Sequence, residues 1–224
     1  LRSAVIAGMI KILEIYNDLV ASGEILRNNA QIEVLPHLDD LKAALEKPIK
    51  KSLFRKASSP PKGLYIWGGV GSGKSFLMDL FAANTDVPAR RIHFHAFMQE
   101  VQNDLHTARA TSEKDALNLV ARNLSKGLRL LALDEMQIKD IADAMIVGRL
   151  FTLLRKEGVV CVTTSNRPPD DLYKEGLNRQ LFLPFIGYLK ENLIVHDMQS
   201  DTDFRQNRMS GEQVYFNPLN TAAS

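Results

Sequence analysis

The chain has 224 residues, of which 45% are hydrophobic and 24% are charged, and its formal net charge is +2. This length and apolar content suffice for one well-buried domain. The charge is too small to indicate nucleic-acid binding. The single cysteine, Cys161, excludes an internal disulfide and fits a reducing compartment. No uncharged apolar stretch approaches the roughly 20 residues that a bilayer-spanning helix needs, so a cytoplasmic protein is expected.

Residues 1–61 predict an N-terminal helical segment followed by a linker. Apolar residues recur at helical spacing over 4–22, and a second helix is expected within 29–46. A basic run over 47–56 and a Pro/Ser-rich run then form the connection. The basic run fits contact with an acidic surface, although a solvated linker is the commoner role of such a run.

From Gly63 to about residue 200, apolar strands alternate with helices. Five strands are expected, over 63–67, 92–97, 128–133, 159–164 and 192–196. Near-continuous Val, Ile and Leu strands separated by helices are typical of a parallel sheet covered on both faces. The helix before the fourth strand should end at Gly158 and bury one face, formed by Ala142, Ile146, Leu150, Leu153 and Leu154. The sequence therefore predicts an α/β core over 62–200.

The segment 68–75 matches the phosphate-loop pattern G-x-x-x-x-G-K-[ST] in full, with the residues Gly68, Gly69, Val70, Gly71, Ser72, Gly73, Lys74 and Ser75. Glycines let consecutive backbone N–H groups point at phosphate oxygens, Lys74 supplies a cation for the β- and γ-phosphates, and the Ser75 hydroxyl can ligate Mg²⁺. A strand before the loop and a helix after it place a helix N-terminus at the anion. The alternative, a chance glycine-rich turn, does not account for this order of elements. We expect a nucleoside triphosphate to bind here.

An acidic pair, Asp134 and Glu135, ends the third expected strand. We interpret it as a Walker B element, in which Asp134 holds Mg²⁺ and Glu135 deprotonates the attacking water. Neighbouring side chains leave a strand on opposite sides, which suits two separate roles. The alternative is an ordinary acidic exit from a strand. The pairing favours a hydrolase over a kinase.

Two further polar residues are candidates for the hydrolytic site. Asn166 follows the fourth expected strand, where an uncharged amide can hold the lytic water without repelling the γ-phosphate. A turn-forming Asn before Arg167 is the alternative. Arg179 can neutralise charge that develops on the γ-phosphate, but a surface salt bridge would explain it as well. Arg205 is a second, less supported candidate for a phosphate contact.

His93 and His95 stand two apart on one expected strand, a spacing that raises the question of a metal site. No further His or Cys ligand lies nearby in the sequence, so packing of the strand is the favoured interpretation. Cys161 is expected to be inert in the core.

Several segments together resemble the ZapE/AFG-type ATPases of the AAA+ class. They are 63–75, 93–98, 140–145, 164–166, 170–173, 176–179, 182–186 and, near the start, 16–23. The resemblance covers nearly the whole chain and is more specific than a phosphate loop alone. It implies a P-loop NTPase fold of the AAA+ type, an αβα sandwich with a five-stranded parallel sheet and an N-terminal helical extension. It also implies ATP and Mg²⁺ as cofactors.

The resemblance further implies assembly into rings in which Arg179 reaches a neighbour's nucleotide. For bacterial members it implies association with the division protein FtsZ at the inner face of the membrane, and for mitochondrial members turnover of respiratory-chain subunits. Two departures stand out. Met136 replaces the usual Phe, and the chain stops soon after Met198, so residues 201–224 are expected to be only the start of a truncated lid region.

Two other functions remain open on the sequence. A DNA-associated initiator or helicase loader shares the AAA+ core but needs a basic DNA-reading surface, of which only the run 47–56 is visible. A scaffold that ATP orders without turnover is the second. The intact Lys74, Asp134 and Glu135 argue against it, while a missing lid would favour it.

Overall fold

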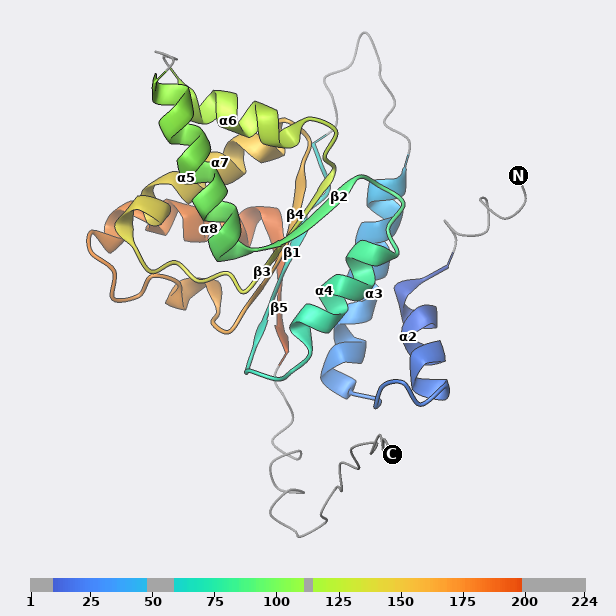
Figure 1. Ribbon diagram of the computed structural model, residues 1–224. Coiled ribbons are helices and arrows are strands. Elements are labelled where there is room, and N and C mark those ends of the chain that lie inside the picture. Colours follow the sequence, from blue (N-terminus) through green and yellow to red (C-terminus); the bar gives the residue numbers. More distant parts are fainter. Residues whose placement is uncertain (1–9, 48–58, 111–114, 199–224) are drawn as a thin grey trace, which may run out of the picture.

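The computed structural model describes residues 10–47, 59–110 and 115–198. Its centre is a sheet of five parallel strands in the order β2-β3-β4-β1-β5 (Figure 1). The strands are β1 (Gly63–Gly68), β2 (Ala89–His93), β3 (Leu130–Asp134), β4 (Val160–Ser165) and β5 (Leu193–Met198). Every residue of β3 and β4 is buried, as expected of strands that are covered on both faces. The predicted parallel α/β sheet is therefore confirmed.

Helices cover both faces of this sheet (Figure 1). One apolar cluster joins the sheet to α2 (Ile12–Ala21), α3 (Asn29–Glu46) and α4 (Lys74–Ala83). A second cluster on the other face joins it to α5 (Phe94–Ala110), α6 (Ala116–Ser125), α7 (Ile141–Lys156) and α8 (Leu183–Asn192). Two short 3-10 turns, η1 (Pro169–Asp171) and η2 (Arg179–Leu181), lie between β4 and α8. The N-terminal helices thus pack on the same layer as the helix that follows the phosphate loop.

The bounds predicted for the second strand, 92–97, are wrong. Strand β2 ends at His93, and α5 begins at Phe94. Phe94, Phe97, Met98 and Val101 are all buried, and their spacing of three or four residues is that of one helix face. His95 therefore lies on a helix, and the two histidines do not share a strand.

Two other expectations about helices need correction. Helix α6 was not expected at all, although it buries Leu117 and Val120. In α7, Ala142 is exposed and the buried face instead includes Asp143 and Ala144. The expected end of α7 at Gly158 is confirmed, because this glycine has a left-handed φ of 89°.

Some expectations fall on residues outside the described ranges. They include most of the basic run 47–56, Arg205 and the whole region 201–224. Of the helices in the described ranges, none combines the length and the apolar character that crossing a membrane requires.

Candidate nucleotide-binding site

The phosphate loop joins the carboxyl end of β1 to the first turn of α4. Gly71 and Gly73 have φ values of 83° and 86°, a left-handed conformation that favours glycine. Gly73 occupies the N-cap position of α4, and Lys74 begins the helix. The loop therefore ends at a helix N-terminus whose free N–H groups and dipole attract anions.

Lys74 is buried, and its ammonium group faces the loop. The Nζ atom donates to the carbonyl oxygens of Gly68 at 3.0 Å and Gly69 at 2.7 Å, and to the Ser72 hydroxyl at 3.2 Å. Burial lowers the pKa of Lys74, while the charges of Asp134 and Glu135 act in the opposite direction. The loop thus holds a buried cation against its own carbonyl oxygens.

Asp134 is the centre of the polar contacts at this edge of the sheet. It is only 1% exposed, and its Oδ1 atom accepts a hydrogen bond of 3.0 Å from the Ser75 hydroxyl. The sequence predicted Ser75 and Asp134 as metal ligands, and the fold brings these two oxygens together. Hydroxyl and carboxylate oxygens are ligands that Mg²⁺ accepts, so the donor set fits this metal.

Arg91, on β2, is a site residue that the sequence analysis missed. Its guanidinium donates to Asp134 Oδ2 at 2.6 Å and to Asp79 Oδ1, on α4, at 2.7 Å. It balances the charge of a buried carboxylate, which would otherwise be costly. A short edge strand with consecutive arginines, Arg90 and Arg91, was the available signal, but only the strand order places it beside β3.

Thr164, on β4, connects both residues of the acidic pair to the neighbouring strand. Its hydroxyl donates to Asp134 Oδ1 and accepts from the Glu135 N–H at 2.9 Å. Its carbonyl accepts from the Met136 N–H at 2.7 Å. Glu135 has a left-handed φ of 56° and an exposed side chain. The backbone thus turns at Glu135 so that its carboxylate faces solvent while Asp134 stays buried.

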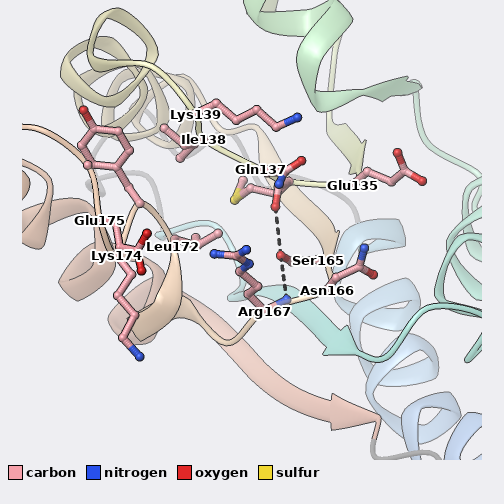
Figure 2. A pocket seen from close by; sticks show the side chains of 13 residues that line it. Glu135, Gln137, Ile138, Lys139, Ser165, Asn166, Arg167, Leu172, Lys174 and Glu175 are labelled. Carbon is pink, nitrogen blue, oxygen red and sulfur yellow. Dashed lines mark hydrogen bonds between the residues drawn. The ribbon is translucent and has the colours of Figure 1, made fainter.

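Glu135 and Asn166 line one open pocket of about 360 Å³, together with Ser165, Arg167 and residues of the loop 172–176. Figure 2 shows Glu135 and Asn166 at one end of this pocket, and Lys174 and Glu175 at the other. The Ser165 hydroxyl donates to the Met136 carbonyl at 2.9 Å and fixes the two strand ends relative to each other. Asn166 thus lines the same pocket as Glu135, and its catalytic role stays a prediction.

Arg179 does not join this cluster in the described structure. Its guanidinium donates to the carbonyl oxygens of Leu172 at 3.1 Å and Asp170 at 2.6 Å. Asp170 lies in η1 and Leu172 directly follows it, so these contacts hold the arginine within the segment between β4 and α8. No described contact links Arg179 to the phosphate loop of the same chain.

The model of the family described as AFG1-like ATPase matches residues 11–224. The chain belongs to the AFG1-like ATPase family. The resemblance inferred from the sequence is therefore confirmed. Among the described site residues, the phosphate loop and the acidic pair are the elements that a family of ATPases requires.

Two relatives show how far the similarity extends. Cell division protein ZapE of Escherichia coli is 38% identical over 162 residues, which are 72% of this chain and 43% of ZapE. Lactation elevated protein 1 homolog B of Danio rerio is 43% identical over 160 residues, which are 67% of this chain and 32% of that protein. The chain thus spans less than half the length of each of these relatives.

Solved structures with the same fold include replication proteins. The crystal structure of DnaI aligns with a TM-score of 0.54 and 18% identity, over 77% of this chain and 87% of DnaI. The replication initiator DnaA, bound to AMPPCP and single-stranded DNA, aligns with a TM-score of 0.55 and 16% identity, over 85% of this chain and 55% of DnaA. At such identities the likeness shows the fold alone, which is that of P-loop AAA+ proteins.

Proposed function

We propose that this AFG1-like protein binds ATP with Mg²⁺ and hydrolyses it to ADP and phosphate. The observation that carries the proposal is the 3.0 Å hydrogen bond between Ser75 Oγ and Asp134 Oδ1. It joins the end of the phosphate loop to the acidic pair, and phosphoryl transfer to water needs both in one place.

Each residue of the site has a distinct role in this proposal. The loop N–H groups and Lys74 hold the phosphates, and Ser75 and Asp134 hold the metal. When bound, Mg²⁺ neutralises charge on the β- and γ-phosphate oxygens. Glu135 accepts a proton from the attacking water on its exposed carboxylate, and the Asn166 amide orients that water without adding charge.

Removal of the metal or of its carboxylate ligand tests this assignment. In phosphate-release assays with ATP, EDTA should abolish turnover, and Asp134→Asn should lower it by about 100-fold or more, since charge stabilisation of the transferring group is lost. Asp104→Asn is the matched control, because Asp104 is exposed on α5. Turnover by Asp134→Asn at the level of the control would contradict the proposed metal site.

We propose that Arg179 acts on the nucleotide of a neighbouring subunit in a ring. Its contacts within its own loop support this, because they leave it apart from the phosphate loop of its own chain. Arg179→Ala should lower turnover on the order of 10³-fold. Mixing it with Lys74→Ala should restore part of the activity, because the first variant supplies an intact nucleotide site and the second an intact arginine. Absence of any rescue would contradict a role in trans.

The partner and setting are proposed from the likeness to ZapE. We propose that the protein acts on a partner in cell division, and the resemblance to ZapE points to FtsZ as this partner. We also propose a cytoplasmic location, with peripheral association at the inner face of the membrane. We also propose three parts of the chain: an N-terminal segment with a linker over 1–61, the nucleotide-binding core over 62–200 and a C-terminal region over 201–224. Capture of bound proteins by a Glu135→Gln variant in its ATP-bound state tests the identity of the partner. Failure of added FtsZ to bind that variant would overturn the FtsZ assignment.

A DNA-associated role is the alternative, and nothing specific favours it. The likeness to DnaI and DnaA shows the fold alone. Titration with duplex DNA at two salt concentrations distinguishes a DNA-associated role from action on a protein partner. Contacts with DNA phosphates give an affinity that falls steeply as the salt concentration rises. We expect no such binding.

A further inference from the structure

A chain of hydrogen bonds links the two N-terminal helices to the phosphate loop. The Tyr16 hydroxyl, on α2, accepts from the Asn28 N–H at 3.0 Å and donates to Gln31 Oε1, on α3, at 3.0 Å. Gln31 Nε2 then donates to the carbonyl oxygen of Ser72 at 3.2 Å. The contact joins residues 41 positions apart in the sequence, and no family motif in the loop predicts it.

The direction of this chain is fixed by chemistry. The Ser72 carbonyl only accepts, so the amide NH₂ of Gln31 must face it. The amide oxygen of Gln31 then faces Tyr16, whose hydroxyl can donate there while it accepts from the Asn28 N–H. All three polar groups are satisfied in one arrangement, and a rotated amide would lose the bond to Ser72 and leave the Tyr16 O–H without Gln31 Oε1 as its acceptor.

The contact orients one peptide group of the loop. The described chain has no cis peptide bond, and in a trans peptide the C=O and the following N–H point in opposite directions. Because the Ser72 carbonyl points out of the loop at Gln31, the Gly73 N–H points away from Gln31. This orientation turns the Gly73 N–H to the side of the loop where we expect a phosphate to bind.

The approach of Gln31 to the loop depends on Gly73. A Cβ atom at Gly73 would lie 2.1 Å from Gln31 Nε2, closer than any real contact. The second glycine of the phosphate-loop pattern therefore leaves room for the side chain that braces the loop, besides adopting its left-handed φ of 86°.

The bracing helices are themselves firmly attached. Tyr16 is fully buried, and its ring lies 6.5 Å from that of Phe76, in the first turn of α4. The Ile12 N–H donates to Asp39 Oδ1, which ties the start of α2 to α3. Gln31 thus projects from a packed pair of helices.

We propose that Gln31 is a positioning residue for the phosphate loop, and that docking of α2 and α3 is coupled through it to phosphate binding. This rests on the proposed function of the loop. Because coupling between two sites is reciprocal, bound phosphate should tighten the attachment of α2 and α3 as much as this attachment tightens phosphate binding. Partners that pull on the N-terminal helices would then alter nucleotide affinity.

Calorimetric titration of the chain with ADP tests the positioning role. Gln31→Leu keeps most of the volume but loses the bond to Ser72, so ADP affinity should fall about fivefold to tenfold, the worth of one hydrogen bond. Gln31→Glu should lower the affinity for ADP further, because its carboxylate would face the Ser72 carbonyl and add negative charge near the phosphates. Glu33→Leu, an exposed position on the same helix, is the matched control and should bind ADP like the wild type.

Two further measurements separate this role from a merely structural one. Urea unfolding of the apo protein reports the stability lost when Leu at this position leaves the buried Tyr16 hydroxyl without its acceptor, whereas ADP should slow hydrogen exchange of α2 and α3 in the wild type but not in the variant. Unchanged ADP affinity in both Gln31 variants would overturn the inference, as would equal protection of α2 with and without Gln31. Should Gln31→Leu fail to fold, Tyr16→Phe, which frees the Gln31 amide, must weaken ADP binding instead.

The proposed function has its own control in this experiment. Lys74→Ala should abolish ADP binding in the same titration. If Lys74→Ala fails to bind ADP while the Gln31 variants bind normally, only the role of Gln31 is wrong. If the wild type itself does not bind ADP, the proposed nucleotide site and the inference fall together.

Discussion

Thr164 and Asp134 share a hydrogen bond between neighbouring strands, in which the threonine hydroxyl donates to a carboxylate that is 1% exposed. The same hydroxyl accepts from the N–H of Glu135. One side chain thus aligns the two residues to which metal binding and proton transfer are assigned. Hydrogen bonds in such buried networks are worth more than their surface counterparts, so loss of the Thr164 hydroxyl should be felt even though Asp134 keeps its contacts with Arg91 and Ser75.

Two substitutions at Thr164 should therefore separate the contribution of the side chain's shape from that of its hydroxyl group. Thr164→Val keeps the branched shape but loses the hydroxyl, and should lower the free energy of unfolding by about 1–3 kcal/mol and kcat by roughly 10- to 100-fold, with a smaller change in KM for ATP. Thr164→Ser should retain most of both quantities. Steady-state kinetics and urea unfolding check this. Equal behaviour of the Val and Ser variants would show that the hydroxyl does not align the acidic pair.

Gly68 and Gly69, adjacent at the start of the phosphate loop, should respond differently to alanine. A Cβ at Gly68 would lie 2.4 Å from the carbonyl oxygen of Met198 on β5, whereas a Cβ at Gly69 meets no atom within 4 Å. Gly68→Ala must push backbone against backbone and should cost about 1–3 kcal/mol of stability. The free energy of unfolding of Gly69→Ala should stay within about 0.5 kcal/mol of the wild-type value. Thermal and urea unfolding of the two variants decide whether β5 supports the loop this closely.

The stability of the protein should depend on pH through His196, on β5. Its ring lies 5.3 Å from that of His37, on α3. Burial, followed by the charge of His37, holds the pKa of His196 below its usual 6.5, against the opposing charges of Glu33 and Asp197. The unfolded chain therefore takes up a proton at a higher pH than the folded chain. The stability from His196 is complete above about pH 6.5 and is lost as the pH falls through the folded pKa.

Replacing His196 should remove this dependence. Urea unfolding at pH 7.5 and 5.5 should show a smaller loss of stability on acidification for His196→Gln than for the wild type. His106→Gln, an exposed histidine on α5, serves as the control and should keep the wild-type dependence. An identical pH dependence in all three proteins would rule out His196 as the group responsible.

The sequence alone predicts the sheet and the phosphate loop because both depend on local patterns. Uninterrupted apolar runs indicate buried parallel strands, and the spacing of glycines with Lys74 indicates a phosphate loop. The end of β2 at His93 was not predicted, and the reason is physical. Alternating aromatic and histidine residues over 92–97 fit a strand, but burial of Phe94 together with Phe97 and Met98 requires a helix.

The supporting contacts of the site were not predictable in the same way. Arg91 reaches Asp134 only because β2 lies beside β3, and Gln31 reaches Ser72 only because α3 packs against the loop. Thr164 carried a local signal, as a hydroxyl residue at the end of β4, but its partner is 30 positions away. Tertiary contacts of this kind depend on strand order and helix packing, which a single sequence does not specify.

The Glu135→Gln variant tests the central proposal most directly, because it replaces the proposed base with an isosteric amide that cannot accept the proton. ATP binding by calorimetry and phosphate release should be measured on the same preparation, with Mg²⁺ present. We predict ATP affinity within about threefold of the wild type and turnover lower by about 10²- to 10⁴-fold, the usual contribution of general-base catalysis. Undiminished phosphate release with intact binding would contradict it.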